Sequence, residues 1–202
     1  ERVLAKSLAS IAKQVDEIIL VDTGSSDATM EIARGYGARV SSFVWQDDFA
    51  AARNAALEQA GGDWIVFLDA DEYFTPDTAG NLRRVILARE QAGAMACLIK
   101  LIHIDSDAKG TVLGGMYALR VFRNLPELRY VGRIHEELRF AGDAVTPLAA
   151  IPPKELQLEH TGYSTSLSRG KAERNLNLLL AELAITDHEE RLYGYLADAY
   201  LG

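Results

Sequence analysis

A run of five apolar residues in the middle of the chain leads straight into a cluster of acidic side chains. Trp64–Leu68 is apolar throughout, and Asp69, Asp71 and Glu72 follow within four positions. An uninterrupted apolar run of this kind is typical of a strand covered on both faces, as in a parallel or mixed sheet. Ligands of open α/β folds bind beyond the ends of such strands. The run therefore predicts an α/β fold with carboxylates gathered at one rim of its sheet.

Helical and strand patterns alternate on either side of this run. In chain order we expect a helix around residues 4–11, a strand at 18–21, a helix at 27–36, a strand at 38–43, a helix at 49–60, the strand at 64–68 and a helix at 77–91. Ser25 or Ser26 is the expected cap of the second helix and Asp48 that of the third, while Pro76 suits the first helical position of the fourth. This order is that of a wound α/β sheet.

The pattern changes in the second half of the chain. Strands expected at 95–104, 116–122, 134–140 and 156–160 indicate a mixed or antiparallel extension of the sheet. From residue 166 onward the pattern is helical, with one apolar face of the first helix formed by Leu176, Leu179, Leu180 and Leu183. A second helix at 189–200 has the spacing that begins a tetratricopeptide repeat, and an ordinary helical hairpin is the alternative. We therefore predict a domain at 1–165 and a helical extension at 166–202.

Charge and cysteine content exclude several classes of protein. The net charge of −8 argues against broad nucleic-acid binding, because no excess of basic residues offsets the repulsion of the phosphates. Cys97 is the single cysteine and lies in an apolar run, so it predicts a buried core residue and no disulfide framework. No apolar run approaches the roughly 20 residues of a membrane span, and no signal peptide is visible. We expect a cytoplasmic location.

The paired acids after the central strand predict a metal site. Asp69 and Asp71 stand at i and i+2 and repel one another unless a cation lies between them. Divalent cations such as Mg²⁺ prefer oxygen ligands, and they commonly accompany phosphate-bearing substrates. Asp22 ends an earlier strand next to a Gly-Ser turn, so it belongs at the same rim if the strands are parallel. The alternative for Asp22 is an Asx turn or a helix cap.

Three further residues carry chemistry that suits such a site. Arg53, on the first turns of a helix, has the planar fork that matches phosphate oxygens, although a lone arginine is also a common surface residue. Glu136 follows His135 in a region expected to be extended, and the pair suits a metal ligand or a general base. His160 closes a short strand and suits either a metal ligand or a hydrogen-bonded core histidine. We assign no role to His103.

Six short stretches, taken in this order, resemble glycosyltransferase family 2, the inverting transferases of GT-A fold. They are Ile18–Thr29, Asp48-Phe49 with Arg53-Asn54, Phe67–Glu72, Arg120–Arg123, Tyr130–Glu136 and His160–Tyr163. The resemblance spans nearly the whole chain, and its last three stretches are similar to a bacterial subgroup in which the transferase precedes tetratricopeptide repeats. It implies an α/β GT-A (Rossmann-like) mixed sheet flanked by helices, with a C-terminal helical hairpin.

The resemblance also implies a role for each candidate residue. Asp22 is expected at the nucleotide base, and Arg53 near the nucleotide. Asp69 is expected near the ribose and the metal, Asp71 as a ligand of Mn²⁺ or Mg²⁺, and His160 as a further metal ligand. Glu136 is the candidate base that deprotonates the acceptor. Its weaker rivals are Glu137 and Asp143.

The implied reaction is the transfer of a sugar from a nucleotide-sugar donor, expected to be UDP-linked, to an acceptor nucleophile. The acceptor classes in view are a glycan, a lipid-linked sugar and a peptide, which suit the synthesis of cell-surface glycans or glycoconjugates. Peripheral association with the inner face of the membrane fits the lipid-linked case. The C-terminal helices offer a surface for protein partners.

The sequence departs from the family pattern at its start. Family members begin with a strand ending in a Lys-Asn/Asp-Glu type motif, and Glu1-Arg2-Val3 falls where that strand should already have ended. If that first strand is missing, the edge of the sheet beside Ile18–Val21 should be open.

Two other functions compete with the transferase. A phosphohydrolase of the haloacid dehalogenase type also places Asp-x-Asp after an apolar strand, with the first Asp, here Asp69, as nucleophile. In that class the motif stands near the start of the domain, whereas here two strands precede it. A non-catalytic, transferase-like scaffold acting through its helices is the second alternative, and the set of acids argues against it.

Overall fold

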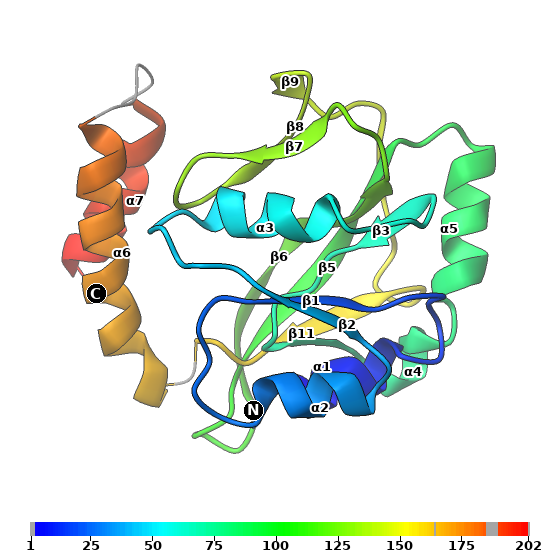
Figure 1. Ribbon diagram of the computed structural model, residues 1–202, viewed down its shortest axis with the longest axis horizontal. Helices are drawn as coiled ribbons and strands as arrows, with labels where there is room; N and C mark the ends of the chain where they lie inside the picture. Colours follow the sequence, from blue (N-terminus) through cyan, green and yellow to red (C-terminus); the bar gives the residue numbers. More distant parts are fainter. Residues whose placement is uncertain (1–2, 164, 185–189, 202) are drawn as a thin grey trace.

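The computed structural model describes residues 3–163, 165–184 and 190–201. Its helices are α1 (Leu4–Ile11), α2 (Thr29–Gly35), α3 (Phe49–Leu57), α4 (Pro76–Ala79), α5 (Leu82–Gln91), α6 (Thr165–Leu183) and α7 (Glu190–Leu201). Its strands are β1 (Ile19–Asp22), β2 (Arg39–Ser42), β3 (Trp64–Val66), β4 (Glu72–Phe74), β5 (Ala96–Asp105), β6 (Thr111–Arg123), β7 (Leu128–Val131), β8 (Glu137–Phe140), β9 (Asp143–Ala144), β10 (Leu148–Ala150) and β11 (Gln157–His160). Figure 1 shows the helices arranged around a central twisted sheet, with α6 and α7 together on one side of the molecule.

The central sheet is mixed, as the sequence predicts. Its strand order is β3-β6-β5-β11-β4, with β10 also paired to β5. Strands β10 and β11 run parallel to β5, whereas β3 and β5 each pair with β6 in the antiparallel sense. Two smaller sheets complete the fold: β1 pairs with β2 in parallel, and β7-β8-β9 form an antiparallel meander.

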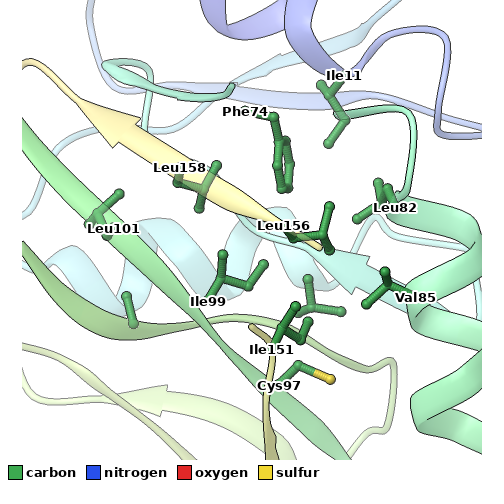
Figure 2. Packing of buried hydrophobic residues seen from close by; sticks show 12 residues of the cluster. Ile11, Phe74, Leu82, Val85, Cys97, Ile99, Leu101, Ile151, Leu156 and Leu158 are labelled. Atoms are coloured by element: carbon green, nitrogen blue, oxygen red, sulfur yellow. The ribbon is translucent and has the colours of Figure 1, made fainter. Parts of the chain in front are cut away.

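Two apolar layers cover the opposite faces of this sheet. One packs α1 and α5 against it, and Figure 2 shows Ile11, Leu82 and Val85 meeting residues of β5 and β11. The other packs α3 and the β7-β8 meander against the far face. Strand β5 contributes to both, because Cys97 belongs to the first layer and its neighbour Ala96 to the second. Cys97 is therefore a buried core residue, as predicted, and burial raises the pKa of its thiol to about 11.

Local signals set most boundaries in the first half of the chain. The Asp48 carboxylate accepts a hydrogen bond from the Ala51 N–H and caps α3, and Pro76 is the first residue of α4, both as predicted. The expected serine cap of α2 is wrong, because that helix begins later, at Thr29, without a side-chain cap. The expected long helix at 77–91 is divided into α4 and α5 by the turn at Gly80.

The second half differs more from the sequence prediction. Of the strand expected at 134–140, only the last part is a strand, β8, because His135 adopts a positive φ of 50° that breaks an extended conformation. Strand β6 begins five residues earlier than expected, at Thr111 instead of Met116. In α6 the expected apolar face is wrong at Leu180, which is 44% exposed, while Leu178 takes the buried place beside Leu179.

An open gap separates β1 from β3. Within the part of the chain that the structure describes, β1 pairs only with β2, and β3 pairs only with β6. A cavity of about 890 Å³ lies between the two free edges, with α1 residues on one wall and α3 residues on the other. Consecutive residues of both strands line it, which is expected where a cavity meets the edge of a strand instead of a face. The open edge beside β1 agrees with the sequence prediction, and the gap explains why Trp64–Val66 is only partly buried.

Candidate active site

The acids lie in a tight turn between β3 and β4, at one end of this cavity. The Glu72 N–H donates to the Asp69 carbonyl oxygen at 2.9 Å, which closes the turn. The Thr161 N–H donates to the Asp71 carbonyl oxygen at 3.1 Å, and the antiparallel pairing of β4 with β11 places His160 opposite Glu72. Sheet register therefore brings His160 to the acids from almost 90 residues further along the chain.

Asp71 and His160 face each other at the cavity. His160 Nε2 lies 3.3 Å from Asp71 Oδ2, and both residues line the cavity. On its other side, His160 Nδ1 lies 3.1 Å from Nδ1 of His103, because β11 and β5 are paired with these two histidines in register. Burial, together with the charges of His160 and Lys100, lowers the pKa of His103. Tyr163 packs edge-on against both imidazoles.

Asp69 faces away from this pair and into two arginines. Its Oδ1 lies 2.9 Å from Arg53 Nη2, and its Oδ2 lies 3.2 Å from Arg120 Nη2. Burial raises the pKa of Asp69, but the charges of Arg53 and Arg120 outweigh that effect, so the pKa lies below its ordinary value. The two acids of the Asp-x-Asp motif both line the cavity but differ in their partners, since Asp69 contacts two arginines and Asp71 a histidine.

Arg120 and Glu72 form a buried ion pair that sequence reasoning missed. Arg120 Nε donates to Glu72 Oε2 at 2.8 Å and its Nη2 donates to Oε1 at 2.6 Å, and the Glu72 side chain is 1% exposed. Burial raises the pKa of Glu72 above its ordinary value although Arg120 opposes that effect. The signal available in the sequence was an arginine within the otherwise apolar run Ala118–Phe122.

Arg53 connects Asp69 to Glu136. It lies on α3, and the Asn54 side chain fixes that helix by exchanging two hydrogen bonds with the backbone of Tyr130, each at 2.9 Å. The Arg53 guanidinium stacks over the Phe67 ring, 4.7 Å from its centroid. Its Nε donates to Glu136 Oε1 at 2.5 Å, and among the described residues its buried Nη1 has no hydrogen-bond partner.

The remaining candidates have surroundings of their own. Asp22 is buried, and its carboxylate accepts hydrogen bonds from the N–H groups of Gly24 and Ser25, each at 3.0 Å, which is the Asx-turn alternative. Burial acts to raise the pKa of Asp22, but the hydrogen bonds from Ser25 and Gly24 lower it overall. Glu137 is paired with Arg139 on β8, and Asp143 lies exposed on β9.

The donor set suits a divalent cation that also binds a phosphate ligand. Among the described residues, no three His, Cys, Asp or Glu side chains are grouped closely enough to hold a metal by themselves. Of the three expected metal ligands, only Asp71 and His160 face each other, because Asp69 is turned to the arginines. Mg²⁺ in phosphate-binding sites is commonly held by one or two carboxylates, with phosphate oxygens and water completing the shell. Asp71 supplies one such carboxylate, and the His160 imidazole lies beside it.

Comparison with known proteins identifies the family. The family model described as glycosyl transferase family 2 matches residues 1–109. A TPR repeat-containing protein of Synechococcus elongatus is 34% identical over 94% of this chain, and the glycosyltransferase SunS of Bacillus subtilis, derived from the prophage SPbeta, is 28% identical over 87%. The chain spans 46% and 40% of those two proteins, respectively.

Solved structures show the same fold at low sequence identity. The structure of residues 1–349 of S. aureus TarS, crystallised with UDP-GlcNAc, matches 99% of this chain and is itself covered to 68%, with a TM-score of 0.62 at 18% identity. Glucosyl-3-phosphoglycerate synthase of Mycobacterium tuberculosis, crystallised with Mn²⁺, UDP and glucosyl-3-phosphoglycerate, matches 93% of this chain and 77% of that enzyme with a TM-score of 0.56 at 18% identity. The GT-A fold expected from the sequence is thereby confirmed. On the match of the family model over more than half of its length, the chain belongs to glycosyl transferase family 2.

Proposed function

We propose that this chain carries the active site of a metal-dependent, inverting glycosyltransferase that uses a UDP-linked sugar. The observation that carries the proposal is the Asp71–His160 pair, which lies at the cavity beside an Asp69 held by two arginines. The proteins of similar fold crystallised with UDP-GlcNAc, or with Mn²⁺ and UDP, support the donor and the cation. Membership of family 2 removes the support for the phosphohydrolase alternative.

In this proposal Asp71 and His160 hold the cation, and the arginines complete the surroundings of the donor. A bound Mn²⁺ or Mg²⁺ supplies charge that stabilises the departing diphosphate. Arg53 lines the cavity on the side of the nucleotide, and Asp69 stands between Arg53 and Arg120 near the ribose. Asp22 holds the turn at Gly24 and Ser25, and Thr23, which begins that turn, lines the cavity where the base is proposed to bind.

Glu136 is the proposed base. The acceptor nucleophile attacks the anomeric carbon from the face opposite the diphosphate, a new bond forms there, and the bond to the diphosphate oxygen breaks with its electron pair. The acceptor proton passes to the Glu136 carboxylate, a transfer typically worth about 10²–10⁴-fold in rate. The ion pair with Arg53 fixes that carboxylate near the acids. Glu137, paired with Arg139, and the exposed Asp143 are weaker rivals for this role.

We propose the domain bounds, the acceptor and the location of the protein on the same basis. Residues 1–165 form the transferase domain, and 166–202 form a helical extension whose second helix begins a tetratricopeptide repeat, as the name of the Synechococcus relative suggests. The acceptor is a glycan, a lipid-linked sugar or a peptide, in the synthesis of cell-surface glycans. No helix among the described residues is long and apolar enough to cross a membrane, and the association we propose with the inner face of the membrane is peripheral.

Thermal unfolding in the presence of nucleotides tests the proposal. UDP with Mn²⁺ at 100 times its Kd should stabilise the protein by about 2.7 kcal/mol, which is a rise in Tm of about 5–11 °C for a domain of this size. Asp71→Ala should lose the part of this rise that depends on Mn²⁺, whereas Glu31→Ala, an exposed acid on α2, should keep it. Failure of every nucleoside diphosphate to raise the Tm of the wild-type protein would favour the scaffold alternative.

A further inference from the structure

The loop that carries Glu136 rests on the C-terminal helices. Residues 132–136 connect β7 to β8, and Ile134 in this loop is 3% exposed. Ile134 packs in a cluster with residues of α6 and α7, which are Leu178, Leu179, Leu192 and Leu196. The Arg133 N–H also points to the buried Glu182 of α6, with 3.4 Å between the nitrogen and Oε2. The helical hairpin thus forms the support of this loop.

A stacked ring pair holds the next residue of the loop. The imidazole of His135 lies on the ring of Tyr195 in α7, with 3.6 Å between ring centroids and 5° between ring planes. His135 has a φ of 50°, a left-handed conformation that is uncommon for residues other than glycine and needs support from its surroundings. The stacked Tyr195 supplies such support directly beside Glu136.

From this loop a continuous series of contacts reaches the acids. Glu136 accepts from Arg53 Nε, and Arg53 Nη2 lies 2.9 Å from Asp69 Oδ1. The Arg133 carbonyl oxygen accepts from the N–H of Phe49, the first residue of the helix that carries Arg53, at 2.8 Å. The loop is therefore held between α3 on one side and the hairpin on the other.

We propose that the α6–α7 hairpin is a working part of the active site and that Tyr195 is a positioning residue. By stacking on His135, Tyr195 sets the place of Glu136 and, through Glu136, that of Arg53. Tyr195 itself touches neither donor nor acceptor. The catalytic part of this inference rests on the proposed function, while the structural coupling does not.

The test compares substitutions at both rings with a control on the same hairpin. Tyr195→Ala and His135→Asn each remove the stack, and Asn tolerates the left-handed backbone. Tyr195→Phe keeps the ring, and Leu180→Ala alters an exposed position of α6. Because small misplacements of catalytic groups are costly, Tyr195→Ala should lower kcat for sugar transfer about tenfold or more with little change in the KM for donor. Tyr195→Phe and Leu180→Ala should stay near wild type.

A second readout does not depend on activity. The nuclear magnetic resonance signal of the Arg53 Nε–H, which bonds Glu136, should shift in Tyr195→Ala and His135→Asn and stay in place in Tyr195→Phe. The double variant should show no further shift, because both substitutions remove one contact. If no transfer is found in the wild-type protein but this resonance shifts, the proposed function fails and the coupling stands. An unchanged Arg53 resonance and an unchanged kcat in Tyr195→Ala would overturn the proposal.

Discussion

Replacement of Arg120 by methionine should destabilise the protein strongly, because it leaves a buried carboxylate without its cation. Arg120 donates two hydrogen bonds to Glu72, whose side chain is 1% exposed. Removing one partner of a buried ion pair typically costs about 3–5 kcal/mol. The Arg120 side chain is 16% exposed, so water can replace part of the lost interaction, and we expect a value near the lower end of that range.

The expected loss is measurable by thermal unfolding. For domains of this size about 1 kcal/mol shifts the Tm by roughly 2–4 °C, so about 3 kcal/mol corresponds to a fall of roughly 6–12 °C. The double variant Arg120→Met/Glu72→Gln should recover at least about 1 kcal/mol relative to Arg120→Met, because the charge that lost its partner is gone. An exposed pair such as Arg83–Asp16 is the matched control, and Arg83→Met should change stability far less than Arg120→Met does.

The loss should also depend on pH in a definite direction. Burial places the folded-state pKa of Glu72 above its ordinary value of 4.5, and Arg120 opposes that rise. In Arg120→Met the opposing charge is gone, so the folded-state pKa of Glu72 rises further. A group whose pKa is raised on folding stabilises the folded state at low pH, and that stability is lost as the pH rises through the folded-state pKa. The difference in unfolding free energy between wild type and variant should therefore be largest at neutral pH and shrink toward pH 4.5.

A stability loss for Arg120→Met no greater than that of Arg83→Met would refute this reasoning. So would a loss that grows as the pH is lowered, since protonation of Glu72 removes the unpaired charge. Either result would mean that Glu72 is hydrated or paired elsewhere in the folded protein. The ion pairs of Asp69 with Arg120 and Arg53 would then also be in doubt.

Three further predictions follow from the same structure. Glu136→Gln should keep metal-dependent donor binding, measured by calorimetry, and lose about 10²-fold or more in transfer rate; equal loss of both would argue against a base. Asp48→Ala should lower the unfolding free energy by about 1 kcal/mol in denaturant titrations, because it removes the cap of α3, and no change would mean that the cap is dispensable. Ile18 and Asp22 accept hydrogen bonds from β2, and because such residues alternate along a strand, the amide of Val21 faces the gap. In hydrogen exchange the Val21 amide should therefore exchange faster than that of Leu20; equal protection would mean that the gap is filled.

Features set by neighbouring residues could be predicted from the sequence. The cap at Asp48, the first helical position at Pro76, the strand ending at Asp22 and the acids after β3 all depend on contacts within a few residues. These local signals fixed the alternation of strands and helices, and with it the place of the acids at a strand end. The strands of the second half were also expected from residue patterns, and the family resemblance added the GT-A fold to which they belong.

Features set by sheet register could not be predicted. His103 lies beside His160 only because β5 and β11 pair in parallel, and Arg120 meets Glu72 across 48 positions of the chain. His103 carries no local signal that distinguishes a site from a core, and the arginine in the apolar run Ala118–Phe122 gives no indication of its partner. The conformation of His135 was also missed, since an extended pattern in the sequence gives no sign of a left-handed residue held by Tyr195.

The central claim is that Asp71 and His160 hold a cation that binds the diphosphate of the donor. Calorimetric titration of UDP into the protein, with and without Mn²⁺, tests this claim most directly when wild type and Asp71→Ala are compared. We predict that Mn²⁺ tightens binding to the wild type by at least about tenfold, equivalent to about 1.4 kcal/mol, and that Asp71→Ala loses this gain while keeping its fold. Binding that is equally tight with and without Mn²⁺ in the wild type, or an undiminished gain in Asp71→Ala, would contradict the claim.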